Sequence, residues 1–348
     1  MKIGILTFHQ ADSYGAVLQA YALQQTLKTL GAESRFVQIR MPAPPAESKP
    51  AAGGAAIFAR KLQAEGQKRK ALFGDFRREY MEISREYAPT DDIDGDFDCF
   101  LAGSDQIWNF RIPGADARYF LPFARPEKRY SYAASFGAEG LPEKTKAWAA
   151  RQLSAFQAIS VREESGCRIV KELTGRDAVV CLDPTLLPER THWEKLTREE
   201  PEGDCVLLFL LNYDEMLLEK ARQEADRLGV PLRVITASFM PRLGMAAWNT
   251  TGVTDWLTAI RNARCVFTNS FHGMVFSMIF GRSFHVQRLT GELSSRNGRI
   301  EGMLASLGLS SALEDPVQPD YEKVWGLLEE RKEASLDYLR SILHDRTV

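Results

Sequence analysis

The chain has 348 residues, of which 45% are hydrophobic and 26% charged, a balance typical of soluble globular proteins. This length favours two domains over one. A formal net charge of −2 and the lack of a block of Lys and Arg argue against a general nucleic-acid-binding protein. Residues 1–10 lack the features of a signal peptide, so we expect a cytoplasmic protein, with contact to the inner face of the membrane left open.

Metal chemistry is not indicated by the sequence. The five cysteines form no C-x-x-C pair, and the five histidines are scattered without a pair at helical spacing. The acidic stretch 91–98 does not have the ligand spacing of a calcium loop, and a solvated turn explains it better. We therefore expect buried, reduced thiols and no metal site.

Apolar runs and helical stretches alternate in the first half of the chain. We expect strands at 2–8, 35–39, 98–102, 130–135, 158–162 and 179–182, with a helix at 16–30. A loop rich in Pro, Gly and Ala is expected at 41–56, and the charged residues 57–87 favour a helical insertion. This alternation is typical of a parallel, doubly wound sheet.

A second series begins after a connection at 185–203. We expect strands at 206–211, 232–236, 265–267 and 284–287, and helices at 214–229, 255–262, 271–281, 294–307 and 321–344. The fold class is therefore α/β, with two Rossmann-like domains facing across a cleft: 1–190 with an insertion at about 41–90, and 200–320, followed by a C-terminal helix at 321–348. Ligands in such folds bind at the carboxyl ends of the strands.

The segment Arg264–Gly281 reads as a short strand, a polar turn and an apolar helix. Such a turn aims backbone N–H groups at one point, which makes the helix start an anion site at Asn269, Ser270 and Gly273. His272 would place a proton donor beside that anion. The alternative is a capping or packing histidine on a buried core helix.

Two arginines occupy similar positions. Arg162 lies at the end of a predicted strand, where it could pair with phosphate or carboxylate, or instead with the neighbouring Glu163 or Glu164. Arg296 lies in the first turn of a helix that Ser294 or Ser295 would cap, and the alternative there is a surface arginine.

Two polar loops of the first domain could bind a sugar. Asp12 and Tyr14 follow the first strand, but no G-x-G-x-x-G is present, so a dinucleotide is not indicated. Ser104, Asp105 and Trp108 follow the strand at 98–102 and offer a donor, an acceptor and a flat ring. An ordinary helix cap and a capped turn with a packed tryptophan remain the alternatives.

Several motifs occur together and in order: DSYGAVLQAYAL, GSDQIWN, YAASFG, SVREESG, LDPTLL, TNSFHGMVFS and SSR-x-x-x-I. Over about residues 2–307 the chain resembles the polysaccharide pyruvyl transferase family. The resemblance implies a GT-B-like fold and transfer of a pyruvyl group from phosphoenolpyruvate to saccharide hydroxyls as a ketal, in the synthesis of cell-surface polysaccharides such as exopolysaccharides.

The resemblance also implies site residues. Arg162 matches the donor-binding arginine of the family, and His272 matches its proposed acid. The position two before this histidine holds Ser270 where the family has arginine, so one expected positive charge is missing; Arg296 or Arg282 could replace it.

The resulting hypothesis assigns a role to each site residue. The catalytic residues are His272 and Asp105. The second domain is the expected donor side, and the donor-binding residues are Arg162, Asn269, Ser270, Gly273 and Arg296. The first domain is the expected acceptor side, and the residues that bind the acceptor, which could be lipid-linked, are Asp12, Tyr14, Ser104 and Trp108. Phosphoenolpyruvate is a substrate, and no cofactor is required. The alternatives are a glycosyltransferase using a nucleotide sugar and a non-catalytic protein that binds carbohydrate or anions.

Overall fold

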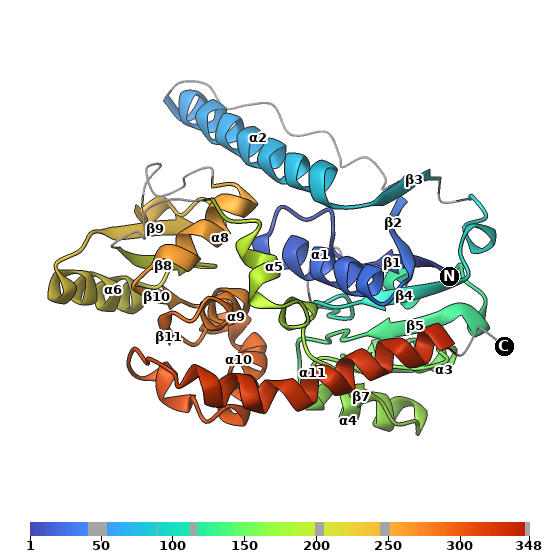
Figure 1. Ribbon diagram of the computed structural model, residues 1–348. Helices are drawn as coiled ribbons and strands as arrows, with labels where there is room; N and C mark the ends of the chain where they lie inside the picture. Colours follow the sequence, from blue (N-terminus) through green and yellow to red (C-terminus); the bar gives the residue numbers. More distant parts are fainter. Residues whose placement is uncertain (41–53, 89, 112–116, 199–204, 244–250, 345–348) are drawn as a thin grey trace.

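The computed structural model describes residues 1–40, 54–88, 90–111, 117–198, 205–243 and 251–344, which form two parallel sheets flanked by helices (Figure 1). The first unit contains the strands β1 (Lys2–Leu6), β2 (Glu33–Ile39), β3 (Ile83–Tyr87), β4 (Cys99–Gly103), β5 (Arg129–Tyr132), β6 (Ser160–Val161) and β7 (Val179–Val180). Its helices are α1 (Tyr14–Thr29), α2 (Gly54–Tyr80), α3 (Glu143–Ser154) and α4 (Glu164–Thr174).

The second unit contains the strands β8 (Val206–Leu210), β9 (Leu232–Thr236), β10 (Cys265–Thr268) and β11 (Ser283–Val286). The helices α5 (Arg190–Glu194), α6 (Glu215–Leu228), α8 (Val253–Asn262), α9 (Phe271–Ile279), α10 (Asn297–Ser306) and α11 (Tyr321–His344) complete the described chain. The prediction of an α/β fold with two Rossmann-like units is confirmed.

All strand pairs within the two sheets are parallel, so their carboxyl ends meet at one edge of each sheet. The first sheet has the order β3-β2-β1-β4-β5, and the bridges Tyr130–Ala158 and Ala134–Val161 attach the β6-β7 pair beyond β5. The second sheet has the order β11-β10-β8-β9. The loops after β1, β4, β5, β6 and β7 therefore follow one another along a single edge, where an open α/β sheet binds its ligands.

The hydrophobic core explains why the strands read as continuous apolar runs. In β8, Leu207 and Phe209 join the core between the two units, while Val206, Leu208 and Leu210 pack on the other face of the sheet, with α6. A strand covered on both faces buries every side chain, as parallel strands usually do. The core between the units also includes α1, α8 and α9, so the two units share one packed interface.

One expectation is wrong. The charged stretch 57–87 is not helical throughout, because α2 ends at Tyr80 and residues Ile83–Tyr87 form β3, the edge strand of the first sheet. The sequence ISREY alternates in polarity only weakly and carries charges, as exposed edge strands often do. The predicted loop at 41–56 lies mostly outside the described residues. Among the described helices, none is both long enough and apolar enough to cross a bilayer.

Helix α11 begins at the second unit and ends against the first (Figure 1). Near its start, the Tyr321 hydroxyl donates to the carbonyl of Arg282. Two turns from its end, the Tyr338 hydroxyl donates to the carbonyl of Ser131 in β5 at 2.8 Å, and the Ser335 hydroxyl accepts from the Leu182 N–H at 3.0 Å. The helix therefore ties the two units together.

The substitution Tyr338→Phe tests this tie. It removes a hydrogen bond that joins α11 to β5 and retains the ring, so we expect the free energy of unfolding to fall by about 1 kcal/mol in urea titrations. The control is Leu327→Ala, at a 43% exposed position of the same helix, where a change within about 0.5 kcal/mol is expected. Equal effects of the two substitutions would contradict the role given to Tyr338.

Candidate functional site

Helix α9 carries His272 at its first turn, directly after β10. Ser270 adopts an extended backbone and its hydroxyl accepts from the Gly273 N–H at 3.2 Å, the usual arrangement of a helix cap. Asn269 is also engaged, since its amide oxygen accepts from the Leu211 N–H at 2.8 Å. These contacts fix the position of His272. The lining of the cavity described below does not include Ser270, Gly273 or Asn269.

The centre of the site is an ion pair between two buried side chains. Arg162, at the end of β6, places Nη1 2.6 Å from Oδ2 of Asp183, which follows β7 and is fully buried. The other Asp183 oxygen accepts from the Thr185 N–H at 3.0 Å and from its hydroxyl at 2.7 Å. Glu163 lies 3.7 Å from Nε of Arg162 and accepts from the Ser135 hydroxyl.

These contacts fix the charges of both partners. Burial alone would raise the pKa of the Asp183 carboxyl, but His272 and Arg162 outweigh it and hold that pKa well below its ordinary value. Burial alone would lower the pKa of Arg162, and the carboxylates of Asp183, Glu163 and Asp105 raise it instead. Asp183 is therefore ionised and Arg162 charged across the physiological pH range.

His272 lies against this ion pair. Its Nε2 is 3.5 Å from Oδ2 of Asp183, which is longer than a hydrogen bond but is an ion-pair distance when the imidazole is protonated. Nε2 has no hydrogen-bond partner among the described residues. The opposite edge of the ring rests on α1: a Cβ placed on Gly15 would lie 2.1 Å from Nδ1. Only glycine allows this approach.

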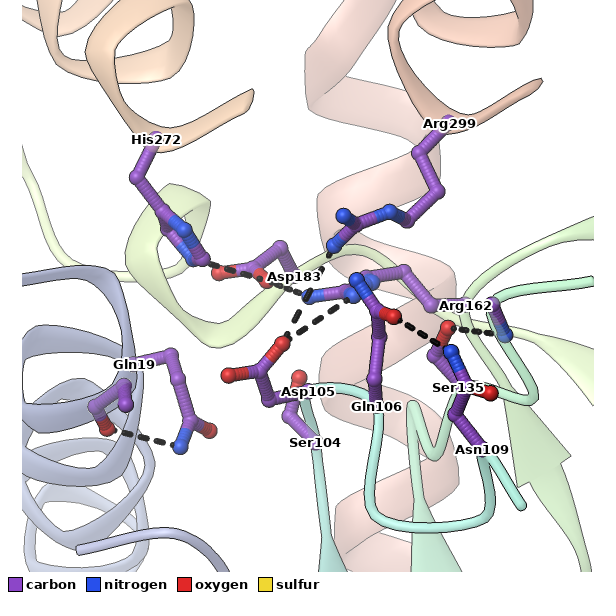
Figure 2. Close-up of polar contacts among 12 residues, drawn as sticks. Gln19, Ser104, Asp105, Gln106, Asn109, Ser135, Arg162, Asp183, His272 and Arg299 are labelled. Atoms are coloured by element: carbon purple, nitrogen blue, oxygen red, sulfur yellow. Dashed lines mark hydrogen bonds and ion pairs between the residues drawn. The ribbon is translucent and has the colours of Figure 1, made fainter. Parts of the chain in front are cut away.

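A second arginine reaches the site from α10 (Figure 2). Arg299 Nη1 lies 3.9 Å from Oδ1 of Asp105, and Arg162 Nη2 lies 3.5 Å from the same oxygen. When the Gln106 side-chain amide is oriented with its oxygen toward Arg299, that oxygen accepts from Arg299 Nη1 at 3.2 Å. Both guanidinium groups lie near the ring of Phe271, at 5.2 Å for Arg162 and 5.4 Å for Arg299.

Asp105 is held in an unusual backbone conformation. Its φ is +61°, in the left-handed region that residues other than glycine rarely adopt. Its carbonyl accepts from the Ser135 N–H at 2.9 Å and from the Ile107 N–H at 2.8 Å, and these bonds maintain the conformation. Backbone strain of this kind gathers at functional sites, and here it directs a carboxylate toward two arginines.

Beside these side chains lies a cavity of about 550 Å³, which we call the arginine cavity. Four arginines line it: Arg162, Arg168, Arg299 and Arg331. Asp183 and Phe271 also line it, and α4, α10 and α11 supply half of its lining residues. His272 is not part of the lining and touches the cavity only through Asp183. The volume is within the usual range for small-molecule sites, about 300–1,000 Å³.

The structure places the expected acceptor residues differently. Trp108 is 1% exposed and stacks on Phe120 at 5.3 Å, so its ring is not available to a sugar. Ser104 is fully buried. Tyr14 stacks on Trp256 of the second unit at 5.0 Å, and Asp12 pairs with Arg77 of α2 at 2.8 Å. Trp108, Ser104 and Tyr14 are therefore packed in the fold around the site, while Asp12 stays partly exposed.

Two functional positions were not singled out from the sequence. Asp183 lies between the strand expected at 179–182 and the connection expected at 185–203. An aspartate that follows a strand and precedes a proline often caps the next turn, as its bond from the Thr185 N–H shows. Arg299, one turn beyond Arg296, is the arginine that enters the cavity. The side chain of Arg296 lies outside the described residues. Arg282 donates to the Phe280 carbonyl at the far end of α9.

The fold and site define a two-unit α/β protein with a cavity at the carboxyl edge of a parallel sheet, where such folds bind their ligands. Four arginines and four carboxylates, those of Glu139, Glu163, Glu164 and Asp183, line this cavity. The model of the polysaccharide pyruvyl transferase family matches residues 14–286, and the chain belongs to that family. No match was found among curated protein sequences.

Among solved structures, the chain is similar to a putative UDP-N-acetylglucosamine 2-epimerase from Listeria monocytogenes, with 12% identity, 99% of this chain and 96% of the other covered, and a TM-score of 0.48. It is also similar to UDP-GlcNAc 2-epimerase from Methanocaldococcus jannaschii, with 11% identity, 99% and 100% coverage, and a TM-score of 0.47. A third is Arabidopsis thaliana UGT89C1 complexed with UDP-L-rhamnose, with 11% identity, 98% and 92% coverage, and a TM-score of 0.42.

The contact between Gly15 and His272 generates a first test of the site. Gly15→Ala favours the helical state of α1 by about 1 kcal/mol, but its methyl group must displace the imidazole. We expect turnover to fall at least about tenfold while the far-UV circular dichroism spectrum is retained.

The matched control is Gly74→Ala on α2, where an added Cβ meets nothing within 4 Å. The same gain in helix propensity is expected there, with unchanged turnover. Full activity in Gly15→Ala would show that the position of His272 does not depend on this contact.

Asp183→Asn tests the central ion pair. The carboxyl binds a proton less readily in the folded than in the unfolded chain, so it stabilises the fold above its ordinary pKa of about 3.8, and this contribution is lost as the pH falls below that value. Since the substitution leaves Arg162 buried without its nearest partner, we expect the free energy of unfolding at pH 7 to fall by about 3–5 kcal/mol.

Urea titrations at pH 7 and at pH 3–4 measure both effects. The difference between wild type and Asp183→Asn should shrink at the lower pH. Asp177→Asn is the control, because its carboxylate is exposed and pairs only with Lys171 at the surface, and it should change little. A difference that is the same at both pH values would contradict the assignment of a depressed pKa to Asp183.

Proposed function

We propose that this protein transfers the pyruvyl skeleton of phosphoenolpyruvate to two hydroxyls of a saccharide, forming a ketal during synthesis of a cell-surface polysaccharide. The observation that carries the proposal is the convergence of Arg162 and Arg299, from the two units, on one carboxylate at the arginine cavity. Family membership supports the same reaction class.

Phosphoenolpyruvate bears a carboxylate and a phosphate, and both are bound well by guanidinium groups. The contacts of Arg162 Nη2 and Arg299 Nη1 with Asp105, at 3.5 and 3.9 Å, are longer than charge-assisted hydrogen bonds of about 2.7–2.9 Å, so Asp105 does not hold these donors at close range. In this proposal Arg299 supplies the positive charge that Ser270 does not provide, and the donor lies across the ring of Phe271.

The proposed reaction has two steps. One sugar hydroxyl adds across the C2–C3 double bond, so that its oxygen bonds to C2 and C3 gains a proton. A second hydroxyl then displaces phosphate from C2 and loses its proton, which closes the ketal. His272 Nε2 delivers the first proton, with Asp183 as counterion of the protonated ring, and Asp105 orients or deprotonates a hydroxyl.

The proposed reaction requires the His272 imidazole to move from its position in the structure. His272 is 8% exposed, with Nδ1 against Gly15 and Nε2 facing Asp183. Donor binding therefore has to draw the imidazole away from Asp183 before Nε2 can reach C3. The 3.5 Å contact is longer than a hydrogen bond of good geometry, so the imidazole can turn without breaking a short hydrogen bond.

The test is calorimetric titration of phosphoenolpyruvate into wild type, Arg299→Ala and His272→Gln. Loss of a charge-assisted hydrogen bond costs about 1.5–3 kcal/mol, so Arg299→Ala should weaken binding by about 10- to 100-fold. His272→Gln should retain binding, because the imidazole acts on the proton, and should lose phosphate release in the presence of methyl pyranosides as acceptors.

The control is Arg222→Ala, which removes an exposed arginine on α6 and should bind phosphoenolpyruvate like wild type. UDP-N-acetylglucosamine is titrated in parallel. If wild type binds this nucleotide sugar and not phosphoenolpyruvate, the pyruvyl-transfer proposal is wrong and a glycosyltransferase is indicated.

A further inference from the structure

A second cavity lies at the carboxyl ends of β1 and β2, away from the arginine cavity. Its volume is about 300 Å³, and we call it the aromatic cavity. The side chains that matter for its chemistry are Phe8, His9, Gln10, Ile39, Arg118 and Tyr119. It is at the small end of the range for small-molecule sites, with room for a monosaccharide unit rather than a long chain.

The order of strands sets where this cavity lies relative to the reacting groups. β1 is flanked by β2 on one side and β4 on the other, so the aromatic cavity is next to the loop after β4, which carries Asp105. Arg162 and Asp183, after β6 and β7, lie further along the same edge. Along this edge, the loop that carries Asp105 therefore follows the strand between β1 and the β5 side of the sheet.

Two partly exposed aromatic rings form one wall. Phe8 and Tyr119 meet edge to face, with ring centroids 5.1 Å apart and planes at 88°. Tyr119 is held in place by the buried Trp108, whose indole N–H donates to the Tyr119 carbonyl at 3.1 Å. Ile39, with the buried Val37, continues the apolar surface. A pyranose ring has an apolar face of C–H groups that packs on such a wall.

The remaining lining is polar but nearly uncharged. His9 donates from Nδ1 to the Thr7 carbonyl at 3.1 Å, and its burial lowers the pKa to about 4, so the ring is neutral. Among the described lining residues, Arg118 is the charged side chain, whereas four arginines and four carboxylates line the arginine cavity. Gln10 is exposed and offers amide hydrogen bonds. This lining suits a neutral, polyhydroxylated ligand rather than an anion.

We propose that the aromatic cavity binds one pyranose unit of the acceptor saccharide, packed against Phe8 and Tyr119. The inference rests on the proposed function for the identity of the acceptor, but the binding itself does not require pyruvyl transfer. The ring of Trp108, expected from the sequence to pack on the sugar, is buried. In this proposal the rings of Phe8 and Tyr119 pack on the sugar instead, and Trp108 helps to position Tyr119. Asp105 follows β4, the strand beside β1, whose following loop lines the cavity.

The experiment is saturation-transfer NMR with methyl glucopyranoside, galactopyranoside and mannopyranoside at millimolar concentration. We expect wild type to bind at least one of them, and Phe8→Ala and Tyr119→Ala to weaken that binding by about five- to tenfold. Phe8→Leu, which keeps apolar volume without a flat ring, should be weakened similarly and guards against a folding defect in Phe8→Ala. Phe58→Ala, at a 46% exposed phenylalanine of α2, should bind like wild type.

Phosphoenolpyruvate titrations on the same variants separate this inference from the proposed function. Retained phosphoenolpyruvate binding with lost glycoside binding in Phe8→Ala supports the aromatic cavity as a distinct subsite. Glycoside binding that depends on Phe8 and Tyr119, in a protein that does not bind phosphoenolpyruvate, would keep the subsite and overturn the pyruvyl-transfer proposal. Absence of glycoside binding in wild type, or equal binding in Phe8→Ala, Tyr119→Ala and wild type, overturns the subsite.

Discussion

The site depends on one buried ion pair, between Arg162 and Asp183. Removing two charges from water is costly, and an ion pair compensates only when the remaining hydrogen-bonding capacity is also satisfied. Here Thr185 satisfies the second oxygen of Asp183, while Glu163 and Asp105 surround the rest of the guanidinium. Because Arg162 follows β6 and Asp183 follows β7, the pair also fixes the relative positions of these two short strands. The ring of His272, from the second unit, is placed against an anion that is already held rigidly.

The interface between the two units fixes the position of the His272 ring. Gly15 lets the imidazole approach the first turn of α1, and Tyr14 beside it stacks on Trp256 of the second unit. Helix α11 crosses both units and hydrogen-bonds to β5 and to the segment that carries Asp183. A small rotation of one unit would change the separation of His272 and Asp183. The packed core between the units opposes such a rotation, since it would expose apolar surface that is now buried.

Much of the architecture could be predicted because parallel strands are apolar throughout and helices are amphipathic. The rule that ligands bind at the carboxyl edge selected Arg162, Asp105 and His272 correctly as neighbours, since each follows a strand. The sequence does not show in the same way which side of a helix, and so which of its arginines, faces the site. The segment from Gly291 begins as a 3₁₀-helix and continues as α10 from Asn297, and Arg299 of α10 lines the cavity. Burial of Trp108 and Ser104 likewise depends on packing from η2 (Ala117–Phe120) and β5, which local sequence does not reveal.

The distribution of charge along the sheet edge gives a physical reason for the departure at Ser270. An arginine two residues before His272 would stand at the cap of α9, where the Ser270 hydroxyl now accepts from the Gly273 N–H. With Arg162 already buried beside His272, a further cation at that cap would also meet the positive end of the helix dipole. Arg299 instead brings its guanidinium from α10, next to Gln106 and Asp105, which disperse its charge. The imidazole of His272 and the guanidinium of Arg162 therefore share Oδ2 of Asp183, and Arg299 brings its charge to Asp105 instead.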